Sequence, residues 1–129
     1  MLHSNILNTD LISLLSRLGH TQSICICDAG LPIPRDIPCI DLALTQNVPD
    51  IVSVLKLIGS NLVIESAVAA SECRDRNPIF TEYLLGASYP VDYITHDEFK
   101  KRSLQCISFV RTGECSPYAN LILNAGVSF

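Results

Sequence analysis

Hydrophobic residues recur with the period of an α-helix near the start of the chain. The residues on this apolar face are Leu11, Leu14, Leu15 and Leu18. Asn8 or Thr9 can accept a hydrogen bond from the first free backbone amides, so the pattern predicts a helix over residues 8–18. Gly19 is the expected C′ residue that ends this helix.

Short apolar runs alternate with further helical patterns along the rest of the chain. We predict strands over 23–27, 39–44, 62–68, 90–94, 107–110 and 121–123. We predict helices over 49–59 and 78–85, and a helical turn over 71–76. Pro49 fits the first turn of its helix, and Gly86 ends the second. Thr95 starts a last helix, with Glu98 as its capping-box partner.

This alternation of strands and helices predicts an α/β fold built on a layered sheet. Nothing in the 129 residues marks a linker, a repeat or a second domain. We therefore expect a single domain over residues 1–129, long enough to bury a core.

Composition narrows the class of protein. No apolar run approaches the ~20 residues of a membrane span. Residues 1–5 lack the basic start and apolar core of a signal peptide. We therefore expect a cytoplasmic protein with no membrane partner. The net charge of −4, without a basic stripe, also argues against nucleic acid as a partner.

The six cysteines form neither a C-x-x-C pair nor a zinc-ligand spacing. Cys25 and Cys27 lie two residues apart on a predicted strand, so both face one side of the sheet. We expect reduced, buried thiols that act as small apolar side chains. Cys115 is the exception because it falls in a polar loop, but no His or Lys neighbours it in sequence to activate it.

Several common functional motifs are missing. The chain contains no G-x-G-x-x-G, no G-x-x-x-x-G-K-[ST], no H-E-x-x-H and no G-x-S-x-G. The sequence therefore predicts neither a nucleotide cofactor nor a metal, and it lacks the common hydrolase signatures.

Polar residues at the ends of the predicted elements are the candidate site. They are His20, Asp28, His96, Tyr118 and Asn120. His20 follows a helix end, where the negative end of the helix dipole favours a protonated imidazole that can donate its proton. Asp28 follows a strand, at the edge where open α/β folds hold their ligands. Together these residues predict a small polar site with one proton donor, but they name no substrate.

Each candidate also has a purely structural explanation. His20 can be a helix cap, and Asp28 can brace its own turn. His96, at the first position of a helix, can simply be exposed. Tyr118 and Asn120 can be ordinary turn residues.

The chain resembles the RbsD/FucU sugar-mutarotase family. The matching stretches are RLGHT at 17–21, CDAGLPIP at 27–34, IDLALT at 40–45, RTGECSPYAN at 111–120 and AGVSF at 125–129. The resemblance covers essentially the whole chain. The ribose branch is closer than the fucose branch, which tends to carry Gly-His-Gly-Asp after its first helix. One departure is a shorter segment between Pro78 and His96 than in many members.

The resemblance implies a three-layer α/β/α fold with a mixed, mostly parallel sheet. It implies an isomerase that interconverts the β-pyranose and β-furanose forms of D-ribose by general acid–base ring opening and closure, with no cofactor. It assigns proton donation to His20. It assigns sugar binding to Asp28, His96, Tyr118, Ala119 and Asn120. It also implies a ring-shaped homo-oligomer, commonly a decamer, in which His20 and Asp28 meet the later residues across subunit contacts.

Two other functions stay open at this point. One is a mutarotase of the L-fucose type that acts on another monosaccharide. The other is a non-catalytic sugar-binding accessory of ribose uptake, which the same polar residues could serve.

Overall fold

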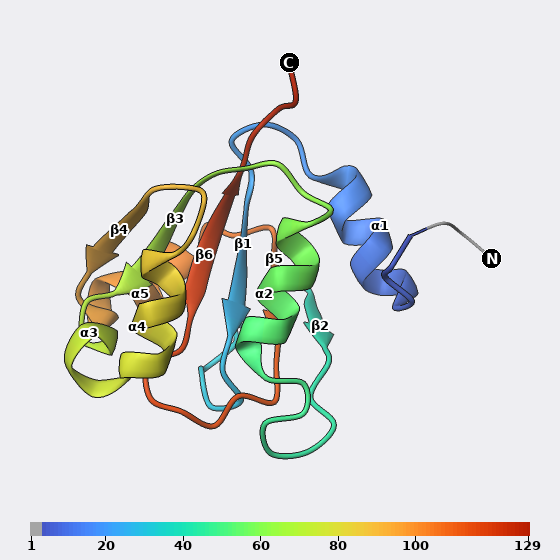
Figure 1. The fold of residues 1–129 in the computed structure, drawn as a ribbon. Helices are drawn as coiled ribbons and strands as arrows, with labels where there is room; N and C mark the ends of the chain where they lie inside the picture. The colour runs from blue at the N-terminus through green and yellow to red at the C-terminus, as the bar shows by residue number, and fades with distance from the viewer. Residues whose placement is uncertain (1–3) are drawn as a thin grey trace.

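The computed structural model describes residues 4–129 (Figure 1). Met1, Leu2 and His3, part of the segment considered for a signal peptide, lie outside the described residues. The helices are α1 Thr9–Arg17, α2 Ile51–Gly59, α3 Cys73–Arg76, α4 Pro78–Leu85 and α5 His96–Ser103. The strands are β1 Ser23–Cys27, β2 Cys39–Asp41, β3 Ile64–Ala70, β4 Val91–Ile94, β5 Ser108–Arg111 and β6 Leu121–Ala125. No helix within residues 4–129 is both long and apolar enough to cross a membrane.

All six strands form one sheet in the order β2-β5-β1-β6-β3-β4. β6 is antiparallel to its neighbours β1 and β3, whereas the other pairs are parallel. Leu121, at the start of β6, pairs with Ile26 of β1 and Ala69 of β3. The start of β6 therefore lies beside the carboxyl ends of these two strands.

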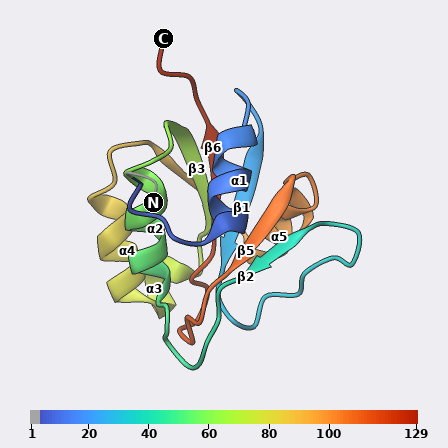
Figure 2. The same cartoon turned by 90° about the vertical axis from the view of Figure 1, so that its right-hand side faces the viewer.

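Helices cover both faces of this sheet (Figure 2). α1, α2, α3 and α4 lie on one side and α5 on the other. Side chains alternate along β1, so that Ile24 and Ile26 join the core under α1 and α2. Cys25 and Cys27 join Phe99 of α5 in the second core, as the strand pattern predicts. The expected three-layer arrangement with a mixed, mostly parallel sheet is confirmed.

α1 starts and ends as predicted. Asn8 Oδ1 accepts a hydrogen bond from Leu11 N at 2.9 Å and caps the helix. Leu18 is the C-cap, so Gly19 takes the predicted C′ position, although its φ is not positive. The left-handed residue of this turn is Thr21, with φ 72°, and its N–H donates to Ala125 O at 3.1 Å. Pairing with β6 thus fixes this turn.

The start of α2 differs from the prediction. Pro49 lies before the helix and not in its first turn, because Asp50 is the N-cap and accepts from Ser53 N at 3.3 Å. Gly113 N donates to Pro49 O at 2.8 Å, so a long-range contact holds this segment. The strand predicted over 39–44 is shorter, since Asp41 accepts from Ala43 N and turns the chain out of the sheet.

The later helices follow their local signals. α4 spans eight residues between Asn77 and Gly86, so the short segment before His96 still holds the predicted helix. Thr95 Oγ1 accepts from Glu98 N at 3.2 Å, as expected of a helix N-cap.

The cysteines are unpaired thiols in the described part of the chain. Cys25, Cys27, Cys73 and Cys106 are buried, as expected. Cys115 is exposed, and so is Cys39, for which burial was the prediction. Cys39 lies on β2, the short strand at the sheet edge, where fewer neighbours cover it.

Candidate active site

A pocket of about 260 Å³ opens at the carboxyl ends of the parallel strands. It is lined by Asp28, Gly30, Leu31, Pro32, Arg76, His96, Pro117 and Tyr118. Asp28 follows β1, His96 follows β4, and Tyr118 precedes β6. Clefts that bind drug-sized ligands have volumes of about 300–1,000 Å³. This pocket is slightly smaller, so it suits a small molecule.

Asn120 holds Asp28 from two sides. Asp28 N donates to Asn120 Oδ1 at 2.8 Å, and Asn120 Nδ2 donates to Asp28 Oδ2 at 3.2 Å. The other carboxylate oxygen accepts from Gly30 N at 2.9 Å, which is the turn-bracing contact of an Asx residue. Asn120 is only 1% exposed, and its two amide atoms hold the backbone and the carboxylate of Asp28 in place.

The environment of Asp28 changes its acidity. Burial raises the pKa of this carboxyl group above its ordinary value. Hydrogen bonds from Gly30, Asn120 and Leu31 stabilise the charged form and oppose this effect, but they do not cancel it. Asp28 is therefore a half-buried carboxylate whose proton affinity is higher than that of a surface aspartate.

His96 and Tyr118 form the aromatic side of the pocket. Their ring centroids lie 5.0 Å apart at 80°, an edge-to-face contact that fixes both rings. His96 Nδ1 is enclosed by protein and has no hydrogen-bond partner among the described residues. Nε2 is not enclosed in this way, so it is the ring nitrogen that a ligand hydroxyl can reach.

Glu72, just before α3, fixes the backbone of His96. Its two carboxylate oxygens accept from His96 N at 3.0 and 3.1 Å. Desolvation acts to raise the pKa of Glu72. The hydrogen bond from His96 N, with smaller contributions from neighbouring groups, outweighs it, so the pKa of Glu72 is lowered. Glu72 therefore serves as an ionised cap on the first amide of α5.

Ala119 lies between Tyr118 and Asn120 but is fully buried in the core on the α2 side of the sheet. It therefore presents no exposed surface to a ligand in the single chain. Tyr118 itself has φ 56°, a left-handed conformation that is uncommon for a residue with a bulky side chain.

His20 lies apart from the other candidates. It sits before β1, whereas Asp28 follows that strand, and the five residues of β1 at about 3.3 Å each separate them by roughly 17 Å. His20 Nε2 lies 3.4 Å from Glu65 Oε2, and its side chain is 48% exposed. The expected grouping of His20 with Asp28 is wrong for one chain. Asp28 instead joins the later residues, because β6 is antiparallel and starts at the same edge.

Two residues of the site were not predicted from the sequence. Arg76 lines the pocket, and Glu72 holds the backbone of His96. Arg76 is an exposed cation on the pocket wall, at the end of α3. The rule that pointed to Asp28 applies here too, since the 71–76 turn follows β3 at the same sheet edge. The contact of Glu72 with His96 has no comparable local signal.

Comparison with known proteins places this geometry in a family. The sequence profile of the RbsD / FucU transport protein family matches residues 1–128. The chain belongs to the RbsD/FucU family. A D-ribose pyranase of Escherichia coli O139:H28 is 42% identical over 139 aligned residues, with all of both chains covered.

Solved structures agree with this family membership. A structure of Bacillus subtilis RbsD complexed with D-ribose superposes with a TM-score of 0.95 at 37% identity, covering all of both chains. A fucose mutarotase of Streptococcus pneumoniae in complex with L-fucose gives a TM-score of 0.81 at 24% identity, again over all of both chains. The second likeness shows a shared fold only. The RbsD/FucU fold expected from the sequence is therefore confirmed.

Proposed function

We propose that this chain is a D-ribose pyranase, an isomerase that interconverts the β-pyranose and β-furanose forms of D-ribose. The observation that carries the proposal is the placement of Asp28 and His96 on one small pocket, in a chain 42% identical to a D-ribose pyranase. The ribose-bound relative, at 37% identity and a TM-score of 0.95, supports ribose as the sugar. The proposal treats the chain as a single catalytic domain.

The pocket has the groups that this reaction needs. Interconversion breaks the bond between C1 and the ring oxygen of the pyranose and forms the bond between C1 and O4 of the furanose. Ring opening requires a proton at the ring oxygen and removal of a proton from the anomeric hydroxyl. Each such transfer by a positioned side chain typically contributes about 10²–10⁴-fold. In this proposal Asp28 and His96 bind and orient the sugar hydroxyls, and no metal or cofactor takes part.

His20 is the proton donor in this proposal, and it reaches the sugar from a second copy of the chain. One chain holds Asp28, His96, Tyr118 and Asn120 together, while His20 lies at the opposite edge of the sheet. A shared site therefore requires a homo-oligomer that brings one copy's His20 to the next copy's pocket. The decameric ring is the assembly that the family resemblance favours. The cytoplasmic location stays a prediction from the sequence.

Two competing functions have definite signatures. The family description names transport proteins, which favours a sugar-binding accessory that binds ribose without changing its ring form. A fucose-type mutarotase would act better on L-fucose than on ribose, but the fucose mutarotase is only 24% identical to this chain.

The test is NMR saturation transfer between the pyranose and furanose signals of D-ribose, with and without the purified protein. We expect transfer to increase in proportion to protein concentration. His20→Gln should bind ribose but leave the exchange rate at its uncatalysed value, because glutamine cannot donate a proton as an imidazolium does. Ribose binding by the wild type without faster exchange would identify the accessory protein. Faster exchange between the ring forms of L-fucose than of ribose would identify the fucose type.

A further inference from the structure

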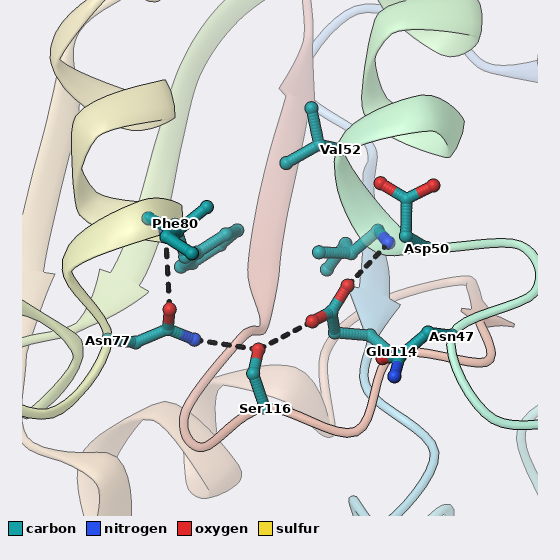
Figure 3. Close-up of a pocket in the computed structure, with 9 residues that line it drawn as sticks. Asn47, Asp50, Val52, Asn77, Phe80, Glu114 and Ser116 are labelled. Atoms are coloured by element: carbon teal, nitrogen blue, oxygen red, sulfur yellow. Dashed lines mark hydrogen bonds between the residues drawn. The ribbon is translucent and has the colours of Figure 1, made fainter.

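The loop that carries Tyr118 is fastened to α4 by the buried side chain of Asn77. Asn77 Nδ2 donates to Ser116 Oγ at 2.8 Å and to Pro117 O at 2.9 Å. Its Oδ1 accepts from Phe80 N at 3.2 Å and caps α4 (Figure 3). Asn77 is 6% exposed, so these contacts are shielded from water. One side chain therefore joins a helix start to the segment just before Tyr118.

The same chain of hydrogen bonds continues to α2. Ser116 Oγ donates to Glu114 Oε2 at 2.6 Å, and Glu114 Oε1 accepts from Ile51 N at 3.0 Å. Figure 3 shows the continuous path from the start of α4 through Ser116 and Glu114 to the start of α2. These groups line a second pocket of about 250 Å³, but their polar atoms are engaged with one another. This arrangement supports the loop and does not favour a ligand there.

Tyr118 needs such support because of its backbone. A non-glycine residue in the left-handed region is sterically strained and persists only when its surroundings hold it there. The carbonyl that Asn77 binds belongs to Pro117, so it lies in the peptide that enters Tyr118. Loss of this contact would let that peptide rotate and move the Tyr118 ring from the His96 ring.

The backbone of His96, the other ring of the pair, is held by a residue at the start of α3. Glu72 and Asn77 flank α3, and the Glu72 carboxylate accepts from His96 N at 3.0 and 3.1 Å. Arg76, the last residue of α3, lines the sugar pocket between them. Residues 72–77 thus hold His96 at one end and the Tyr118 loop at the other.

We propose that Asn77 is a positioning residue for the sugar site, which sets Tyr118 against His96 through the Pro117 carbonyl. The proposal rests on the proposed function for its catalytic consequence. The position of the two rings can be measured without any sugar, so the two proposals can fail separately.

The decisive variant is Asn77→Asp. It keeps the size of the side chain and an oxygen that can cap Phe80 N, since Asp and Asn are comparable N-caps. It removes the Nδ2 donor and turns an oxygen toward Pro117 O. We expect the ribose exchange rate to fall ~10- to 100-fold, as when a group near the reacting atoms is misplaced. We also expect the His96 ring proton signals to shift in the sugar-free protein, because the neighbouring Tyr118 ring has moved.

Asn8→Asp is the matched control. Asn8 caps α1 by accepting from Leu11 N at 2.9 Å, and its side chain donates no hydrogen bond to any residue within 4–129. The same chemical change there should leave the exchange rate and the His96 signals as in the wild type. Folded Asn77→Asp protein with wild-type exchange and unmoved His96 signals would overturn the proposal.

Ser116→Ala tests the same path if Asn77→Asp does not fold. It removes one acceptor of Asn77 and the link to Glu114, but it leaves the bond from Asn77 to Pro117 O. A smaller loss of exchange, with a His96 shift in the same direction, supports the proposal. Unchanged His96 signals in this variant contradict it. If the wild type does not speed ribose exchange, the proposed function fails, and the His96 signals still decide whether Asn77 positions Tyr118.

Discussion

At the scale of single residues, two opposing effects act on the pKa of the Asp28 carboxyl group. Burial raises its pKa, while the hydrogen bonds from Gly30 and Asn120 favour the carboxylate. A raised pKa in the folded state means that Asp28 contributes to stability below its unfolded pKa, and that this contribution is lost as pH rises through the folded pKa. The ionised carboxylate of Asp28 therefore costs the fold some stability above the folded pKa of this group.

This balance predicts the pH dependence of the activity. If the Asp28 carboxylate binds ribose, exchange should fall on acidification at a higher pH than the ordinary 3.8 of an aspartate. Asn120→Ala removes a hydrogen bond to the charged form, so the acid limb should move to still higher pH. Saturation transfer measured over the pH range in which Asp28 titrates gives the acid limb of the wild type and that of Asn120→Ala. An acid limb that stays in place in Asn120→Ala would contradict the role given to Asp28.

Sequence patterns identify these residues better than they identify their neighbours. Asp28 and His96 follow predicted strands, so the edge rule for α/β sheets finds them without a structure. Asn77 has a local signal only as a helix cap before Pro78. Its second role depends on Pro117, a contact forty residues away in the chain that no local pattern indicates.

At the scale of elements, the 112–120 loop depends on a glycine packed against another loop. A Cβ on Gly113 would lie 2.6 Å from Thr45 O and 2.7 Å from Val48 O. These are backbone atoms, which cannot move aside as the end of a flexible side chain can. Gly113 also donates to Pro49 O and accepts from Asn47 N, so the two loops are closely joined there.

Gly113→Ala should therefore lower the free energy of unfolding by about 1–3 kcal/mol, as is typical of overpacking. Gly59→Ala is the control, because nothing lies within 4 Å of a Cβ at that helical position. Gly59→Ala should leave stability unchanged or raise it by about 0.4–1 kcal/mol. Urea unfolding at one fixed protein concentration measures both. Equal stability of the two variants would show that the loop yields at Gly113.

Helix ends that are fixed by contacts close in sequence are predicted correctly, whereas an end that is fixed by a distant part of the chain is not. α4 and the start of α5 are set by caps within a few residues, and both are predicted correctly. The start of α2 is set by a contact of Pro49 with Gly113, far away in the chain, and there the prediction is wrong.

At the scale of the whole molecule, the direction of β6 decides which residues share a pocket. β6 is the antiparallel strand in the middle of the sheet, so its start lies at the carboxyl ends of β1 and β3. Tyr118 and Asn120 precede β6 and therefore reach Asp28 within the same chain. Neither the apolar run at 121–123 nor its flanks reveal the direction of the strand, which is why the sequence-based grouping of His20 with Asp28 fails.

The structure changes which pairs of inactive variants should restore activity when mixed. His20→Ala and Asp28→Ala affect opposite edges of one chain, so a mixed oligomer contains sites with an intact pocket from one copy and an intact His20 from its neighbour. With random mixing of equal amounts, about a quarter of the sites are intact, as expected for a closed ring of repeated interfaces. Asp28→Ala and His96→Ala affect the same pocket of one chain, so every pocket in their mixed oligomer carries one defect or the other, and no activity should return. Saturation transfer on mixtures that were unfolded and reassembled, with mixing verified by native mass spectrometry, measures the recovery. Failure of the first pair to recover in verified mixed oligomers would show that His20 does not serve a neighbour's pocket, whereas recovery by the second pair would show that Asp28 and His96 act from different chains.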